Sequence, residues 1–253
     1  MASGPTFPDF PAIAMVADAY RATLADRVAI IRAGGLWVLA SLLGDLLSVL
    51  GATGTETEGS ETGGPDTLAL PFLLIGWIGL SALTVHRIRT LLLGDPPPAL
   101  MAPLNRHVAR YVLTELVIGA LAVLPSVAAL ALLAPIGGVG LALAAGTVAA
   151  IFVFTRLHLA LPAAALGEPG IAIERSWRAT APVWPKAAFG LIASSAPIAM
   201  IAGSIGATIA AAGAPLSGST IATVAAFAQA AVLGTFLAAS WRRLVGMPPR
   251  PSR

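Results

Sequence analysis

Long apolar stretches alternate with short polar connections along the whole chain. Six of these stretches have the length of a bilayer-crossing helix, which needs about 17–25 residues at roughly 1.5 Å of rise per residue. The predicted spans are residues 30–50, 67–93, 111–133, 139–155, 183–211 and 220–241. The pattern therefore predicts an all-α fold, a polytopic transmembrane bundle of six helices.

The basic residues repeat this alternation. The chain has 15 Lys and Arg residues, and none of them lies in the first, third or fifth connection. All of them lie in or beside the second and fourth connections and the two termini. Because basic loops resist translocation, the sequence predicts a multi-pass protein with both termini in the cytoplasm.

Three regions follow from this topology: a tail with an interfacial amphipathic helix (1–29), the six-helix transmembrane domain (30–241) and a cytoplasmic tail (242–253). Apolar side chains recur at helical spacing between residues 12 and 27, which is typical of a helix that lies on the membrane surface. These side chains are Ile13, Val16, Ala17, Tyr20 and Leu24. The alternative is a solvated helix packed on a partner.

The connections differ in character. Residues 51–66 are rich in Gly, Thr and Glu, and predict an outer loop with too little apolar content to fold alone. The Pro-Ile-Gly-Gly sequence at residues 135–138 predicts a tight outer turn. Residues 171–181 predict a short polar helix at the inner surface, between the fourth and fifth spans. This segment is the second predicted interfacial helix.

Small residues crowd the last four spans. Examples in the fifth span are Ser194, Gly203, Ser204, Gly206 and Ala207. Small side chains let helix backbones approach closely, which is how membrane helices associate without a hydrophobic driving force. The group predicts close helix packing in this part of the bundle.

Composition agrees with membrane residence. Hydrophobic residues make up 57% of the chain and charged residues 11%, and the mean hydropathy is +0.86. The predicted inner side carries all 15 basic residues and six of the acidic ones, a net charge of +9. A charge of this size on that side indicates an interaction with anionic lipid headgroups rather than with nucleic acid.

Two acidic residues lie within predicted spans, where an ionisable group is a functional candidate by default. Glu115 lies near the inner end of its span, at the level of basic residues that end neighbouring spans. It is expected either to form a buried ion pair with Arg156 or Arg87, or to serve as a proton or substrate relay. Asp45 lies near the outer end of the first span and is expected to hydrogen-bond Ser48 or outer water. The candidate polar cluster consists of Glu115, Arg156, Arg87, His158 and Asp45.

Other chemistries lack their motifs. The histidines His86, His107 and His158 have no H-x-x-x-H or H-E-x-x-H spacing, which argues against a metal site. The chain has no G-x-S-x-G elbow, no phosphate-binding glycine loop and no cysteine. The sequence therefore predicts no catalytic residue, no metal and no cofactor.

The stretch from residue 156 to residue 184 is the most distinctive part of the chain. An Arg at the inner end of a span is followed by a short charged helix containing Ser176-Trp177 and then Thr180. This pattern is similar to the YciC-like group of bacterial six-span membrane proteins, which are related to the membrane domain of some glycerophosphodiester phosphodiesterases. In that group a cytoplasmic helix with a Ser-Trp…Thr signature precedes the fifth span.

Two further segments, DAYRATLADRVAIIRAGGLW near the start and HRIRTLLLGDPPP after the second span, also look like this group. The resemblance covers most of the chain. It implies a six-span fold in a bacterial inner (plasma) membrane. It implies no activity, because this sequence contains no counterpart of the phosphodiesterase catalytic domain.

Two hypotheses about function follow. The first is a non-enzymatic integral membrane protein that supports membrane organisation or scaffolds membrane-protein partners through its basic inner surface. The alternative is a small transporter or lipid-handling protein with a path near Glu115 and Arg156. A continuous polar cavity in the structure favours the alternative, and a tightly packed interior favours the scaffold. A membrane enzyme is the weakest reading, because no nucleophile–base pair is apparent.

Overall fold

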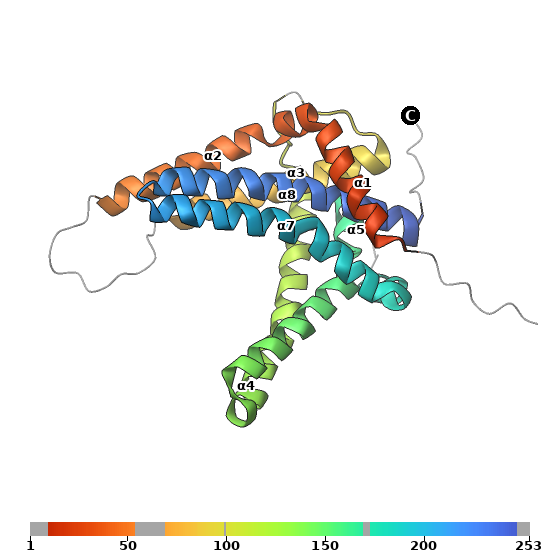
Figure 1. Cartoon of the computed structure of the whole chain (residues 1–253). Helices are drawn as coiled ribbons and strands as arrows, with labels where there is room; N and C mark the ends of the chain where they lie inside the picture. The colour runs from red at the N-terminus through yellow and green to blue at the C-terminus, as the bar shows by residue number, and fades with distance from the viewer. Residues whose placement is uncertain (1–9, 54–68, 99, 169–172, 247–253) are drawn as a thin grey trace, which may run out of the picture.

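The structure of the chain is a computed structural model that describes residues 10–53, 69–98, 100–168 and 173–246. The predicted outer loop from residue 54 onward, and the predicted tails at 1–9 and 247–253, lie outside the described residues. The described residues form helices and no strand (Figure 1). The helices are α1 (Ala12–Ala25), α2 (Arg27–Thr53), α3 (Ala69–Leu93), α4 (Arg106–Leu157), α5 (Ala160–Leu166), α6 (Ile173–Thr180), η1 (Ala181–Val183), α7 (Trp184–Ala211) and α8 (Pro215–Leu244).

Five helical stretches of the described chain are long and apolar enough to cross a membrane. They are Arg27–Leu47, Pro71–Leu93, Arg106–Leu166, Ile173–Ala211 and Pro215–Leu244. Four of them correspond to one predicted span each; their ends differ by at most five residues, except that the stretch from Ile173 also includes α6 and begins ten residues before the predicted span at 183–211. The stretch that begins at Arg106 contains two predicted spans, the third and the fourth, so the described chain has five long apolar stretches where the hydropathy pattern predicts six spans.

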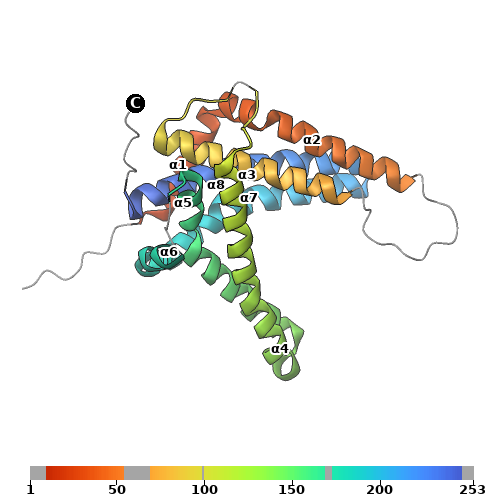
Figure 2. The ribbon, with the colours of Figure 1, turned by 180° about the vertical axis from the view of Figure 1, so that it is seen from behind.

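The chain reverses direction inside α4. Gly138 has φ 80° and ψ 165°, a conformation outside the helical region that glycine adopts without steric cost. Figures 1 and 2 show the two arms of α4 lying side by side as a hairpin that projects from the rest of the molecule. Across the hairpin, the Ser126 hydroxyl donates to the Gly146 carbonyl at 3.0 Å. The reversal coincides with the turn predicted at residues 135–138.

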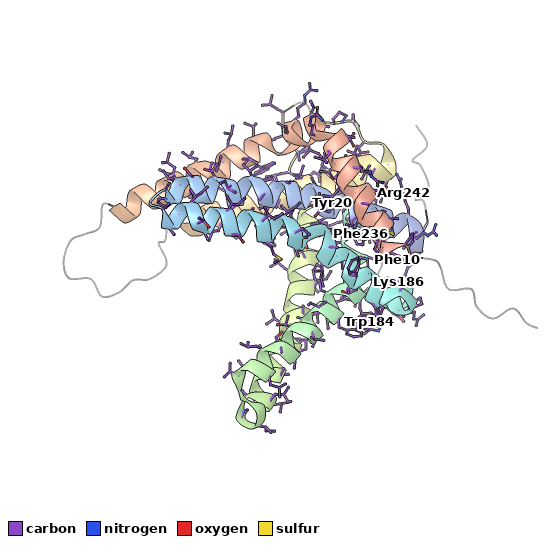
Figure 3. All side chains as sticks on the ribbon, in the orientation of Figure 1. Phe10, Tyr20, Trp184, Lys186, Phe236 and Arg242 are labelled. Carbon is purple, nitrogen blue, oxygen red and sulfur yellow. The ribbon has the colours of Figure 1, made fainter. Side chains whose placement is uncertain are left out.

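The remaining long helices, α2, α3, α7 and α8, form a bundle with α8 at its centre. Helix α8 contacts α1, α2, α3, α5 and α7, and nearly every residue from Ala230 to Trp241 is buried, so this part of α8 is covered on all sides. The short helices α1, α5 and α6 gather at the end of the bundle where α8 finishes (Figures 1 and 2). Trp184, Lys186 and Arg242 lie at this same end (Figure 3).

Helix α1 packs across α7 and α8. Its buried face consists of Ala12, Met15 and Ala19. The Tyr20 hydroxyl donates to backbone carbonyls of α7, and burial raises the pKa of this phenol. The Phe10 ring meets Phe236 of α8 edge-on, with 6.4 Å between ring centroids (Figure 3). Ile13 and Leu24, which belong to the apolar face expected to lie on a membrane, stay 74% and 65% exposed. The helix therefore has a packing partner within its own chain.

Helices α7 and α8 approach each other closely at a pair of glycines. A Cβ atom added to Gly218 would lie 2.5 Å from the Gly206 carbonyl oxygen, and one added to Gly206 would lie 2.9 Å from the Gly218 oxygen. Gly203, in contrast, faces open space. The expected close packing is therefore present at Gly206, and Gly203 has no part in it.

We expect Gly218→Ala to destabilise the bundle, because the added methyl group forces the backbones of α7 and α8 apart. Overpacking of this kind costs about 1–3 kcal/mol. Thermal unfolding of the purified protein in detergent measures the effect. Gly203→Ala is the matched control, since its methyl group meets nothing and alanine is the better helix former. Equal unfolding temperatures for the two variants would contradict the close approach.

Candidate functional site

Glu115 lies in a cavity between α3, α4 and α8. Its Oε2 atom accepts a hydrogen bond from the Ser81 hydroxyl at 3.0 Å, and Trp77 lies in the wall of the same cavity. The cavity has a volume of about 190 Å³, and Tyr111 and Gln229 form part of its wall. We call it the Glu115 cavity. Among the described residues, the hydrogen-bond partners of this carboxyl group are neutral.

Asp45 lies beside a second cavity, of about 300 Å³, between α2, α3 and α8. Its Oδ2 atom accepts a hydrogen bond from the Thr223 hydroxyl at 3.1 Å. Thr223 belongs to α8, far along the chain from the local partners, Ser48 or water, expected from the sequence. We call this space, which also borders Ser41 and Phe72, the Asp45 cavity.

The two cavities are neighbours. Trp77, Leu80 and Ala226 line both of them, so these side chains form a wall that the two cavities share. Trp77, Ser81 and Thr84 follow one another at intervals of four and three residues, which places them on one face of α3. A polar face of α3 thus runs from the Asp45 cavity into the Glu115 cavity.

Arg87 continues this face toward the end of α3, and its charge is compensated by other helices. Its side chain is only 4% exposed, and Nη1 lies 2.7 Å from Asp26 Oδ2. The Nε atom donates to the Thr235 hydroxyl at 2.9 Å. Asp26 occupies the turn between α1 and α2, and Thr235 belongs to α8. Arg87 therefore joins three parts of the chain at one point.

Arg156 is held by α6. Its guanidinium carbon lies 4.5 Å from the centroid of the Trp177 ring, a cation–π distance. Its backbone carbonyl, near the end of α4, accepts hydrogen bonds from Ser176 at 2.9 Å and from Thr180 at 3.0 Å. The Ser-Trp…Thr signature therefore fastens α6 to the base of the α4 hairpin. We call Ser176, Trp177 and Thr180 the α6 clamp.

His158 lies in the junction between α4 and α5. Its side chain is completely buried, and Nδ1 lies 2.5 Å from the Thr155 carbonyl oxygen. Its Nε2 atom has no hydrogen-bond partner among the described residues. His158 is not part of the wall of the Glu115 cavity. The part of the chain that the structure describes holds no group of three His, Asp or Glu side chains suited to a metal ion.

The structure corrects the expected ion pair of Glu115 with Arg156 or Arg87. Within the described chain, Arg87 pairs with Asp26 and Arg156 stacks on Trp177. Each of the two cations therefore has another partner, and Glu115 accepts its hydrogen bond from the Ser81 hydroxyl of α3. The five residues of the predicted cluster therefore lie at five separate places: the Glu115 cavity, the Asp45 cavity, the Arg87 junction, Arg156 beside the α6 clamp, and His158 between α4 and α5.

Sequence reasoning missed most of the partner residues. They are Asp26, Ser81, Tyr111, Thr223, Gln229 and Thr235. One signal was present, the spacing of polar side chains along α3. The partners on α8 carry no such signal, because their role depends on how α8 packs against distant helices.

Comparison with known proteins gives no relative for this chain: no family model matches it, and no curated protein and no solved structure shows significant similarity.

We expect the α6 clamp to show strong non-additivity. Either hydroxyl alone can satisfy the Arg156 carbonyl, because Thr180 can donate to it at 3.0 Å instead of to the Ser176 carbonyl at 2.8 Å. Ser176→Ala or Thr180→Val should therefore cost about 0.5–1.5 kcal/mol. The double variant leaves a buried carbonyl unpaired and should cost about 1–3 kcal/mol more than the two single changes together. Thermal unfolding measures both. Thr208→Val is the control, because that hydroxyl is exposed and bonds only within its own helix. Strictly additive losses would contradict a shared carbonyl.

Proposed function

We propose that this chain is a six-span integral membrane protein that binds and moves a cationic or protonatable solute through the Glu115 and Asp45 cavities. In this topology each arm of α4 counts as one span, and both termini are cytoplasmic. The reversal at Gly138 and the distribution of basic residues support it. The resemblance to the YciC-like group supports a bacterial inner membrane as the location, with α1 and α6 at its inner surface.

One observation carries the transport proposal. The Glu115 carboxyl group lies in a cavity with neutral hydrogen-bond partners and shares a wall with the Asp45 cavity. An isolated carboxylate in a poorly hydrated place is costly, so it gains by taking up either a proton or a cation. Exchange between these two states is the chemistry that a proton-coupled or cation carrier needs.

The mechanism follows from the position of Trp77. A cation that enters the Asp45 cavity is attracted by that carboxylate, and the indole ring of Trp77, which lines both cavities, is a further group that can attract it. Movement of Trp77 would then pass the ion to Glu115. The hydroxyls of Ser81 and Thr84 and the amide of Gln229 provide further polar groups along the wall of the Glu115 cavity.

The second candidate is a scaffold or membrane-organising protein. The predicted inner side of the protein carries a net charge of +9. This charge favours such a role, because it attracts anionic headgroups. Membrane-protein partners would dock on the same side. This role does not require Glu115, which separates the two proposals experimentally.

Cysteine labelling tests the six-span topology, because the chain has no cysteine of its own. Ile136→Cys, at the tip of the hairpin and 87% exposed, and Gly59→Cys should both react with a membrane-impermeant maleimide added to intact spheroplasts. Arg253→Cys should react only after permeabilisation. A thiol at position 136 that is protected in intact spheroplasts would contradict two crossings in α4.

Replacement of Glu115 tests the transport role. Tetramethylammonium, which does not cross bilayers unaided, should enter proteoliposomes with a negative interior potential. Glu115→Gln should reduce this uptake to the level of protein-free vesicles, because the neutral amide no longer attracts a cation. The variant should remain stable, since an amide oxygen can still accept the Ser81 hydrogen bond.

Glu174→Gln is the matched control. This glutamate lies on the exposed face of α6, 68% of its side chain is accessible, and its ion pair with Arg178 contributes little. Its uptake should equal that of the unchanged protein. Equal uptake by Glu115→Gln, or no uptake by the unchanged protein, would reject transport and leave the scaffold role.

A further inference from the structure

A cleft opens between the α4 hairpin and the bundle. Helices α4, α7 and α8 enclose a volume of about 430 Å³, on the side where the hairpin leans away from α7 (Figures 1 and 3). The walls are mostly aliphatic, with Ile151 on one side and Leu191 and Ile192 on the other. The Ser195 hydroxyl in this wall donates to a carbonyl of its own helix, so it presents little polarity to the cleft. We call this space the hairpin cleft.

The hairpin cleft adjoins the Glu115 cavity. Gln229 and Leu233 of α8 line both spaces. One end of the combined space therefore holds a carboxyl group with neutral partners and an aromatic ring, Trp77. The other end is an apolar groove between helices. Taken together, the two volumes fall within the range of roughly 300–1,000 Å³ that is usual for small-molecule sites.

This arrangement selects an occupant by charge. An anionic headgroup would lie against Glu115 with no described basic side chain in the cavity wall to offset the repulsion. An ammonium group finds a carboxylate, the Trp77 ring and the Ser81 hydroxyl there. A hydrocarbon chain attached to that ammonium group would follow the wall past Leu233 into the hairpin cleft.

We propose that the Glu115 cavity and the hairpin cleft form one site for a single-chain amphiphile with an ammonium head, which enters sideways between α4 and α7. This inference rests on the proposed function and specifies its substrate class. The head lies at Glu115, and the chain lies among Ile151, Leu191 and Ile192. The arms of α4 present apolar surface along their length, so the route from the bilayer to the cleft is apolar throughout.

Photolabelling of the full chain in nanodiscs tests the site. The probe is a dodecyltrimethylammonium that carries a diazirine near the end of its chain, and mass spectrometry locates the adducts. We expect adducts on the cleft residues of α4 and α7. A probe with the same chain and a neutral alcohol head should label them about tenfold less, and Glu115→Gln should remove that difference.

Two tryptophan variants test the apolar half of the proposed site, the hairpin cleft. Ala150→Trp fills the hairpin cleft and should lower labelling about tenfold. Val148→Trp, on the same arm but 68% exposed and outside the cleft, should leave it unchanged. Tetramethylammonium uptake checks that each variant still folds and works.

The outcomes separate this inference from the proposed function. Equal labelling by the ammonium and alcohol probes would identify the cleft as a groove for any lipid chain and overturn the inference. Adducts that link two copies of the chain would identify it as a dimer interface, with the same consequence. If butyltrimethylammonium competes with the probe as strongly as dodecyltrimethylammonium does, the hairpin cleft does not bind the hydrocarbon chain. That result would overturn the inference and leave transport at Glu115 intact. If no ammonium compound shows uptake that depends on Glu115, the proposed function itself is rejected.

Discussion

The bundle depends on the compensation of one buried charge. Arg87 is nearly inaccessible, and removing either of its partners would leave a cation without a counter-charge or a hydrogen-bond acceptor, which is strongly unfavourable in a poorly hydrated place. Satisfying it requires the turn after α1, the end of α3 and the middle of α8 to meet at fixed distances. That junction sets the register of α3 against α8. Both carboxyl cavities have part of their walls on those two helices, so the position of Ser81 relative to Gln229 follows from it.

The functional proposal follows from an asymmetry between the charged groups. The cations Arg87 and Arg156 have partners that neutralise them or stack on them. The carboxyl groups Asp45 and Glu115 have hydroxyl partners, which satisfy hydrogen bonding without supplying charge. A structural ion pair would have used one arginine for one acid. The structure instead leaves the acids facing cavities, where a mobile cation or proton is the available counter-charge.

Much of the fold could be predicted from the sequence, because each apolar stretch predicts a helix independently of the rest of the chain. The ends of α3 and α7 lie within a few residues of the predicted limits, and Gly138 stands in the predicted turn. The partner assignments failed for a physical reason. Whether Glu115 meets an arginine depends on the rotation of α4 about its axis and on which side of α3 faces it, and neither is encoded in local spacing. Asp26 shows the same limit, because its ion-pair partner, Arg87, lies 61 residues away along the chain.

In the proposed six-span topology, the hairpin at Gly138 has a consequence for how this architecture can change. A pair of antiparallel arms that enters a membrane and returns contributes an even number of crossings. Its gain, loss or lengthening therefore preserves the orientation of every helix before and after it. Helices α7 and α8 keep their orientation across the membrane in each of these cases, provided that the end of the second arm still reaches the α6 clamp. The hairpin is in this sense a modular insertion, and the cleft it forms can be reshaped without inverting the rest of the protein.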